Sequence, residues 1–246
     1  MEVEQDNLFD FGDFDMATYA DVSKEANNQQ VEGHVNYIEC DAQKHYKYMR
    51  VFRELLNLID GYVAGGCFKN IFSWEAPRDI DVYFETPQQF NNAIQLVARN
   101  TSFEKYYSND NVDAFYYTYG DRKYVVELVK KFFCKPKELL DKFDFSICKF
   151  AVYMKKVKIE NEQNNETLDE EYKLYELYDP DFFEHLYLKK LVADDNIVLP
   201  ASTFTRMIKY IRYGYLPCME TKKKIVEGLR KTDGELTNTS FYDGMD

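Results

Sequence analysis

The chain has 246 residues, 45% of them hydrophobic, and a formal net charge of −12. This length and composition are sufficient for a sizeable core in one or two domains. The five cysteines have no paired spacing, so we expect neither a zinc site nor a disulfide framework, and we infer a reducing compartment. No apolar run reaches the roughly 18 residues of a membrane span and the N-terminus is acidic rather than signal-like, so we expect a cytoplasmic protein without membrane contact.

Residues 1–33 are strongly acidic. They hold nine Asp and Glu residues against a single lysine, a composition that is typical of a flexible tail. Leu8, Phe9, Phe11 and Phe14 lie among these charges. We expect that this acidic N-terminal tail could bind a protein partner through them.

The next strong signal is an apolar strand that leads into two glycines. A helix is predicted over His45–Ile59 from the spacing of its apolar residues, and the run that begins at Tyr62 then reaches Gly65 and Gly66. Because glycine lacks a Cβ, the backbone there can approach a phosphate closely, and the helical turn that follows directs free N–H groups at an anion. Lys69 lies within that turn and adds a positive charge for a triphosphate.

A second predicted strand, Asp79–Phe84, carries two carboxylates. Residues i and i+2 of a strand point the same way, roughly 6.6 Å apart, so Asp79 and Asp81 project together from one face. Two carboxylates this close repel each other unless a cation accompanies them. Mg²⁺ (or Mn²⁺) suits the position, since such ions are held by one or two carboxylates plus substrate phosphates. The glycine turn and this strand together predict a pocket for a nucleoside triphosphate and its metal ions.

The elements that follow predict an α+β fold with a mixed sheet. Thr86 and Pro87 form a helix cap and a first helical position, and this helix should end near Val97. Strands and one brief helix are then expected in the order Phe103–Tyr107, Ala114–Tyr119, Lys123–Val129, Pro136–Lys142 (the helix) and Phe143–Val152.

Two positions compete for a third acid beside the first two. Glu127 interrupts the strand-like run Tyr124–Val129, and Asp144 opens the apolar run Phe143–Val152. A charge within an apolar strand is costly unless it is paired or bound to a metal, so both need an explanation. Glu127 could also face solvent, and Asp144 could also cap the preceding helix. We favour Glu127 and keep Asp144 as the substitute.

The C-terminal part of the chain is predicted to be helical and basic. Helical periodicity indicates helices over Asp181–Val192, Ser202–Tyr213 and Met219–Leu229. Residues 183–231 hold ten basic against five acidic residues, a local excess that could bind an RNA end or a nucleotide. Solvated helix faces would have the same composition.

The glycine pair and the Asp-x-Asp strand resemble the DNA polymerase β-like nucleotidyltransferase superfamily. The likeness is to the head domain of CCA-adding enzymes and poly(A) polymerases and to small phage-type nucleotidyltransferases. By this resemblance, Gly65 and Gly66 match the glycine pair, while Asp79 and Asp81 match the metal ligands. Lys69 falls where CCA-adding enzymes have an arginine followed by an aspartate, and here an asparagine follows instead.

The stretch Leu199–Tyr215 resembles the helix that follows the head domain in these enzymes. The resemblance implies that Arg206 and Lys209 hold the triphosphate and that Tyr210 stacks on the base or the ribose. It further implies metal-dependent transfer of a nucleoside monophosphate from a nucleoside triphosphate (NTP), ATP included, to a hydroxyl of an RNA 3′ end, a small molecule or a protein. The alternative is a nucleotidyltransferase-like module that no longer catalyses and acts by binding partners.

The expected organisation follows from these assignments. It comprises the acidic tail 1–33, a nucleotidyltransferase catalytic domain over 34–158, a polar loop over 159–171, a helical C-terminal lobe over 172–232 and a tail over 233–246.

Overall fold

The computed structural model describes residues 36–42, 47–160, 167–195 and 197–232. The two predicted tails, 1–33 and 233–246, lie outside the described residues. The strands of the main sheet are β1 Ile38–Asp41, β2 Tyr62–Ala64, β3 Ile80–Tyr83, β4 Phe103–Ser108, β5 Val112–Tyr119, β6 Arg122–Val129, β7 Phe150–Glu160 and β8 Thr167–Tyr178. The helices are α2 Lys47–Leu58, α3 Cys67–Phe72, α4 Pro87–Arg99, α5 Pro136–Leu140, α6 Phe182–Tyr187, α7 Pro200–Arg212 and α8 Met219–Lys231.

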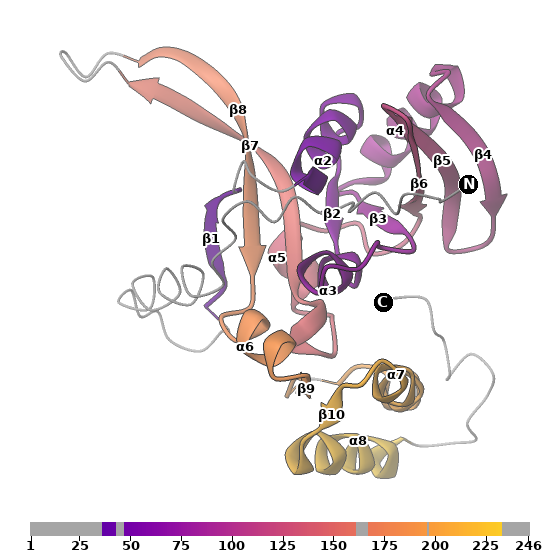
Figure 1. Ribbon diagram of the computed structural model, residues 1–246, viewed down its shortest axis with the longest axis vertical. Coiled ribbons are helices and arrows are strands. Elements are labelled where there is room, and N and C mark those ends of the chain that lie inside the picture. The colour runs from indigo at the N-terminus through magenta and orange to yellow at the C-terminus, as the bar shows by residue number, and fades with distance from the viewer. Residues whose placement is uncertain (1–35, 43–46, 161–166, 196, 233–246) are drawn as a thin grey trace, which may run out of the picture.

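The eight strands form one mixed sheet in the order β1-β8-β7-β2-β3-β6-β5-β4. Strands β3 and β6 run parallel, and the other neighbours in this sheet run antiparallel. Helices α7 and α8 lie beyond one end of the sheet, and a small parallel pair, β9 Lys190–Leu191 and β10 Leu216–Pro217, lies beside them (Figure 1). The predicted α+β fold with a mixed sheet and a small helical part is therefore confirmed.

The helix predicted after β3 is stabilised at its start by the cap that its sequence indicates. The Thr86 hydroxyl accepts a hydrogen bond from the backbone N–H of Gln89, and the Gln89 side chain accepts one from the backbone N–H of Thr86. This reciprocal capping box satisfies two N–H groups that a helix start otherwise leaves unpaired. Pro87, at the first helical position, needs no such partner.

An aromatic cluster fixes helix α3 against the sheet. The ring of Phe150 on β7 lies 4.5 Å from that of Phe68 and 5.1 Å from that of Phe72, both on α3. Phe182 and Phe183 of α6 contact the same cluster at centroid distances of 5.0 Å. The many aromatic residues of the sequence thus anchor the helix that follows the glycine pair.

Within the predicted polar loop 159–171, the described residues 159–160 and 167–171 belong to strands β7 and β8. These strands pair antiparallel and extend past the rest of the sheet (Figure 1), and residues 161–166 lie outside the described residues. The polar side chains of the two strands are compatible with a two-stranded ribbon because they pair across it, as Lys156 does with Glu170. The sequence over 159–171 has no apolar alternation, the pattern by which strands are recognised.

Two further predictions of secondary structure were wrong. The strand expected from Phe143 begins only at Phe150, since Ser146–Cys148 forms a 3₁₀ turn before it. The helix expected over Asp181–Val192 ends at Tyr187, because Lys189 has a φ of 50°, which is incompatible with a right-handed helix. No helix in the described part of the chain combines the length and apolar character that crossing a bilayer requires.

Candidate functional site

The glycine turn connects the buried strand β2 to helix α3. Gly65 has a φ of 96°, in the left-handed region that favours glycine, and its N–H donates to the carbonyl of Phe150 at 3.0 Å. Gly66 occupies the cap position of α3. Cys67 follows it and is buried, and its pKa is raised well above the ordinary value by burial and then by the charges of Asp81 and Asp79. The Cys67 thiol is therefore a protonated packing group close to both aspartates.

Three carboxylates meet on one face of the sheet beside this turn. Asp81 on β3 and Glu127 on β6 are direct neighbours across the parallel pair, and Asp79 immediately precedes β3. The pKa of Asp81 is raised well above its usual range by burial and by repulsion from Asp79 and Glu127, against which Lys209 acts in the opposite direction. Ile80 is buried on the other face of β3. The predicted projection of the two aspartates from a common face is compatible with this arrangement.

Glu127 has a hydrogen-bond donor that the sequence did not reveal. The Tyr107 hydroxyl on β4 donates to the Glu127 carboxylate. Burial raises the pKa of Glu127, the Tyr107 hydrogen bond lowers it, and Asp79 raises it further. Tyr107 reaches Glu127 across the intervening strand β5, so only the strand order could have identified this partner.

A cavity of about 320 Å³ lies between helix α3, the segment before β3 and helix α7. Its lining residues are Gly66, Lys69, Asn70, Glu75, Ala76, Arg78, Asp79, Lys209, Tyr210 and Tyr213. One predicted glycine and one predicted carboxylate thus line the same space. The two lysines expected to contact a triphosphate line it as well.

Lys69 enters this cavity among aromatic rings. Its Nζ lies 4.9 Å from the ring centre of Tyr213 and 5.8 Å from that of Tyr210, and it donates to the Asn70 side chain at 2.8 Å. The pKa of Lys69 is lowered by burial. The Arg78 guanidinium also lies over the Tyr213 ring, at 5.4 Å. Cationic and aromatic groups therefore line the cavity together with Asp79.

Asp144 and Arg206 are joined to each other in a buried ion pair. The Nε and one terminal nitrogen of Arg206 donate to Asp144 Oδ2 at 2.8 and 2.6 Å. Both side chains are more than 90% buried. Arg206 is not among the residues that line the cavity, and its contact with a triphosphate stays a prediction. Asp144 is neutralised by this arginine and has a structural explanation that needs no metal.

Tyr210 and Tyr213 differ in their accessibility. Tyr210, expected to stack on a base, has a side chain only 1% exposed, and its hydroxyl lies 2.9 Å from Cys148 Sγ. Tyr213 is partly exposed in the same cavity. Tyr213 was not among the residues predicted from the sequence, although its position four residues after Lys209 puts the two on one side of a helix.

The described part of the chain contains no group of three or more acidic, histidine or cysteine side chains that could hold a metal ion as they stand. The carboxylates have the oxygen donors that Mg²⁺ and Mn²⁺ take. Their mutual repulsion, seen in the raised pKa of Asp81, is of the kind that a cation relieves. The carboxylate oxygens are donors that fit a divalent ion, although the described side chains are not arranged around a common metal position.

Solved structures with a similar fold include CCA-adding enzymes. The chain is similar to a CCA-adding enzyme in complex with ATP, with a TM-score of 0.55 and 16% identity over 83% of this chain and 49% of that one. It is similar to a CCA-adding enzyme in complex with CTP, with a TM-score of 0.52 and 14% identity over 79% of this chain and 46% of that one. The chain thus spans about half the length of these enzymes. At such identities the likeness shows a nucleotidyltransferase-like fold and no finer subtype.

No curated protein matches the chain. A family model does match it, over residues 27–189, and that family is described as Gabija anti-defense 2 family protein. The match covers about two thirds of the chain and includes the glycine turn, all three clustered carboxylates and strands β1 to β8. The chain therefore belongs to the Gabija anti-defense 2 family.

Proposed function

We propose that the chain is a metal-dependent nucleotidyltransferase that moves a nucleoside monophosphate from an NTP to an acceptor hydroxyl. The observation that carries this proposal is the common cavity of Gly66, Asp79 and Lys209, beside the carboxylates of Asp81 and Glu127. The matched family is described as anti-defense. We propose that nucleotidyl transfer is the means by which this chain acts against that defence.

The triphosphate would lie between the glycine turn and helix α7. Gly66 permits close approach of the backbone, while Lys69 and Lys209 supply positive charge from opposite walls. Tyr213, rather than the buried Tyr210, is the aromatic side chain available to a base or ribose. Arg206 would act from outside the cavity by fixing helix α7.

Asp79, Asp81 and Glu127 would hold the metal ions, with Asp144 assigned to its ion pair instead. Bound Mg²⁺ or Mn²⁺ would activate the acceptor hydroxyl and neutralise charge on the pyrophosphate. The acceptor oxygen attacks the α-phosphorus, the bond to the bridging oxygen of the β-phosphate breaks, and pyrophosphate leaves. A carboxylate with a raised pKa, such as Glu127, suits the group that takes the hydroxyl proton.

The acceptor would be an RNA 3′ end, a small molecule or a protein hydroxyl. The lobe predicted over 172–232 begins within strand β8 of the main sheet, so we propose that the sheet with helices α2 to α6 forms the catalytic body and that α7 and α8 form a helical lobe. The lobe contributes Lys209 and Tyr213 to the cavity, so transfer would require both parts.

The decisive experiment measures pyrophosphate release from each of the four NTPs during titration with Mg²⁺ or Mn²⁺. A total RNA and protein extract supplies acceptors, and an α-labelled NTP identifies which of them becomes modified. The active-site variants are Asp79→Asn and Asp81→Asn. The control is Glu104→Gln, since Glu104 forms an exposed surface pair with Lys123 and does not line the cavity.

Release that depends on metal and is lost in both aspartate variants but not in the control is the expected result. The alternative function, binding without catalysis, is favoured by the lack of a ready-made metal cluster in the described part of the chain. It would be identified by NTP or partner binding without turnover at any metal concentration, and such a result would overturn the enzymatic proposal.

A further inference from the structure

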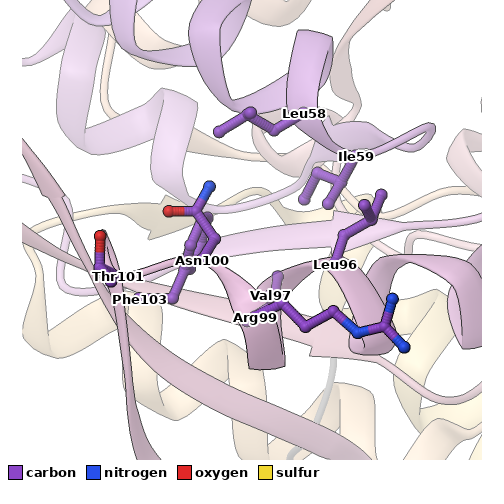
Figure 2. A pocket seen from close by; sticks show the side chains of 8 residues that line it. All are labelled: Leu58, Ile59, Leu96, Val97, Arg99, Asn100, Thr101 and Phe103. Carbon is purple, nitrogen blue, oxygen red and sulfur yellow. The ribbon is translucent and has the colours of Figure 1, made fainter.

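A second cavity lies away from the nucleotide cavity and shares none of its lining residues. It has a volume of about 400 Å³ and lies where the ends of helices α2 and α4 meet the start of β4. Figure 2 shows its lining: Leu58, Ile59, Leu96, Val97, Arg99, Asn100, Thr101 and Phe103. The volume is within the range of about 300–1,000 Å³ in which proteins bind ligands.

The lining is mostly apolar and part of it faces solvent. Leu58 and Leu96 are 41% and 52% exposed, while Ile59 and Val97 form the buried floor. A single exposed leucine needs no explanation. Two of them at the mouth of an apolar cavity form an exposed apolar surface of the kind that marks an interaction site.

Arg99 gives the cavity a positive charge. It is an exposed residue of the last turn of α4, and no ion pair to it occurs within the described ranges. Asp60, which follows Ile59 of the cavity floor, accepts a hydrogen bond from Gln89 at 2.9 Å. An apolar hollow with one available guanidinium fits a segment in which apolar and acidic residues alternate.

We propose that the cavity binds the N-terminal segment Asn7–Asp15 of the same chain. This segment reads Asn-Leu-Phe-Asp-Phe-Gly-Asp-Phe-Asp and so holds four large apolar residues among three aspartates. Its phenylalanines enter the apolar hollow, and an aspartate pairs with Arg99. The segment therefore matches the cavity both in charge and in apolar character.

The length of chain outside the structure permits this contact. The described part begins at Asn36, next to β1, and β1 and β4 are the two edge strands of the eight-stranded sheet. Seven strand spacings of about 4.8 Å separate these edges by roughly 34 Å. The residues between Phe14 and Asn36 reach roughly 70 Å when extended at about 3.3 Å each. The tether therefore spans the sheet with length to spare, and it holds the segment at an effective concentration on the order of millimolar.

The test is site-specific photo-crosslinking in the full chain, with a benzophenone amino acid in place of Leu96. A sample that mixes ¹⁵N-labelled and unlabelled copies is irradiated, and the crosslinked peptides are identified by mass spectrometry. A second variant carries the crosslinker at Leu58, in case the first fails to fold. A control variant carries it at Tyr187, a residue of α6 that is 74% exposed.

We expect crosslinks from Leu96 and Leu58 to residues 7–15 within copies of one isotope, and none to that segment from Tyr187. Replacement of Phe9 and Phe11 by serine should lower the yield more than tenfold. Arg99→Glu should lower it up to about fivefold, the factor for about 1 kcal/mol from one exposed pair, and Asp10→Lys with Asp13→Lys should restore it.

Crosslinks that join copies of different isotopes would show that a second molecule occupies the cavity, and they would overturn the proposal. Crosslinks to another part of the chain, or a yield no greater than that from Tyr187, would overturn it as well. The readout does not depend on nucleotide turnover, so it stands or falls separately from the enzymatic proposal.

Discussion

Replacing Asp144 and Asp81 by asparagine should change the stability of the protein in opposite directions. Asp144→Asn leaves the Arg206 guanidinium buried without a counter-charge, because both partners are more than 90% buried and two N–H donors converge on one carboxylate oxygen. Breaking such a pair from one side costs about 3–5 kcal/mol. With about 2–4 °C per kcal/mol for a chain of this size, the melting temperature should fall by roughly 6–20 °C.

Asp81→Asn should instead raise the stability of the metal-free protein. Burial and the neighbouring carboxylates raise the pKa of Asp81 in the folded state above its unfolded value. The folded protein then binds the proton more tightly, so its stability is lost as the pH rises from about 3.9 through the folded-state pKa. Asparagine stays neutral at every pH and never places a negative charge at this position. The stability advantage of the variant should therefore be absent below about pH 3.9 and largest at neutral pH.

Urea denaturation with a chelator at pH 4 and pH 7.5 measures both effects, and Glu104→Gln is the control because the pair of Glu104 with Lys123 is exposed to solvent and such pairs contribute little to stability. Added Mg²⁺ should stabilise the wild type at pH 7.5 and leave Asp81→Asn nearly unchanged. If Asp144→Asn were as stable as the wild type while Asp81→Asn lost stability in the chelator, the reasoning on both carboxylates would be refuted.

Three further predictions concern single residues. Lys209→Gln should weaken NTP binding by roughly 10- to 150-fold, as expected for loss of one charged contact of about 1.5–3 kcal/mol, and calorimetric titration would measure it. Tyr107→Phe removes the hydrogen bond that lowers the pKa of Glu127, so the acidic limb of the pH–rate profile should move to higher pH; an unchanged profile would exclude Glu127 from the rate-limiting proton transfer. Gly61→Ala should destabilise the protein by about 1–3 kcal/mol in urea, because a Cβ there would lie 2.8 Å from the Tyr83 carbonyl oxygen.

The features predicted well from the sequence depend on contacts close in the chain. The strand–glycine–helix unit around Gly65 and the capped helix at Thr86 are determined by residues within a few positions of one another. Glu127 was preferred to Asp144 as the third acid, but its position directly beside Asp81 could not be predicted. That position depends on β3 and β6 being parallel neighbours, which no local pattern indicates.

The features missed from the sequence depend on distant partners. Arg206 and Asp144 are 62 positions apart, and an arginine on an amphipathic helix has the same pattern whether it faces a phosphate or a buried aspartate. The strand residues 159–160 and 167–171 were missed for a different reason. Their sequence is polar and has no apolar period, so its pattern is that of a loop.

The buried ion pair also bears on the nucleotide cavity, because Arg206, Lys209 and Tyr213 share helix α7. Lys209 and Tyr213 lie three and seven residues after Arg206, so all three are on about the same side of the helix. The ion pair of Arg206 with Asp144 therefore fixes the rotation of helix α7 about its axis at which Lys209 and Tyr213 face the cavity. Asp144→Asn should therefore weaken NTP binding although Asp144 does not line the cavity. Arg206→Lys, which keeps the charge but loses the two-donor geometry, should have a smaller effect of the same sign. Equal NTP affinity in the wild type and in folded Asp144→Asn would show that helix α7 is positioned by its other contacts instead.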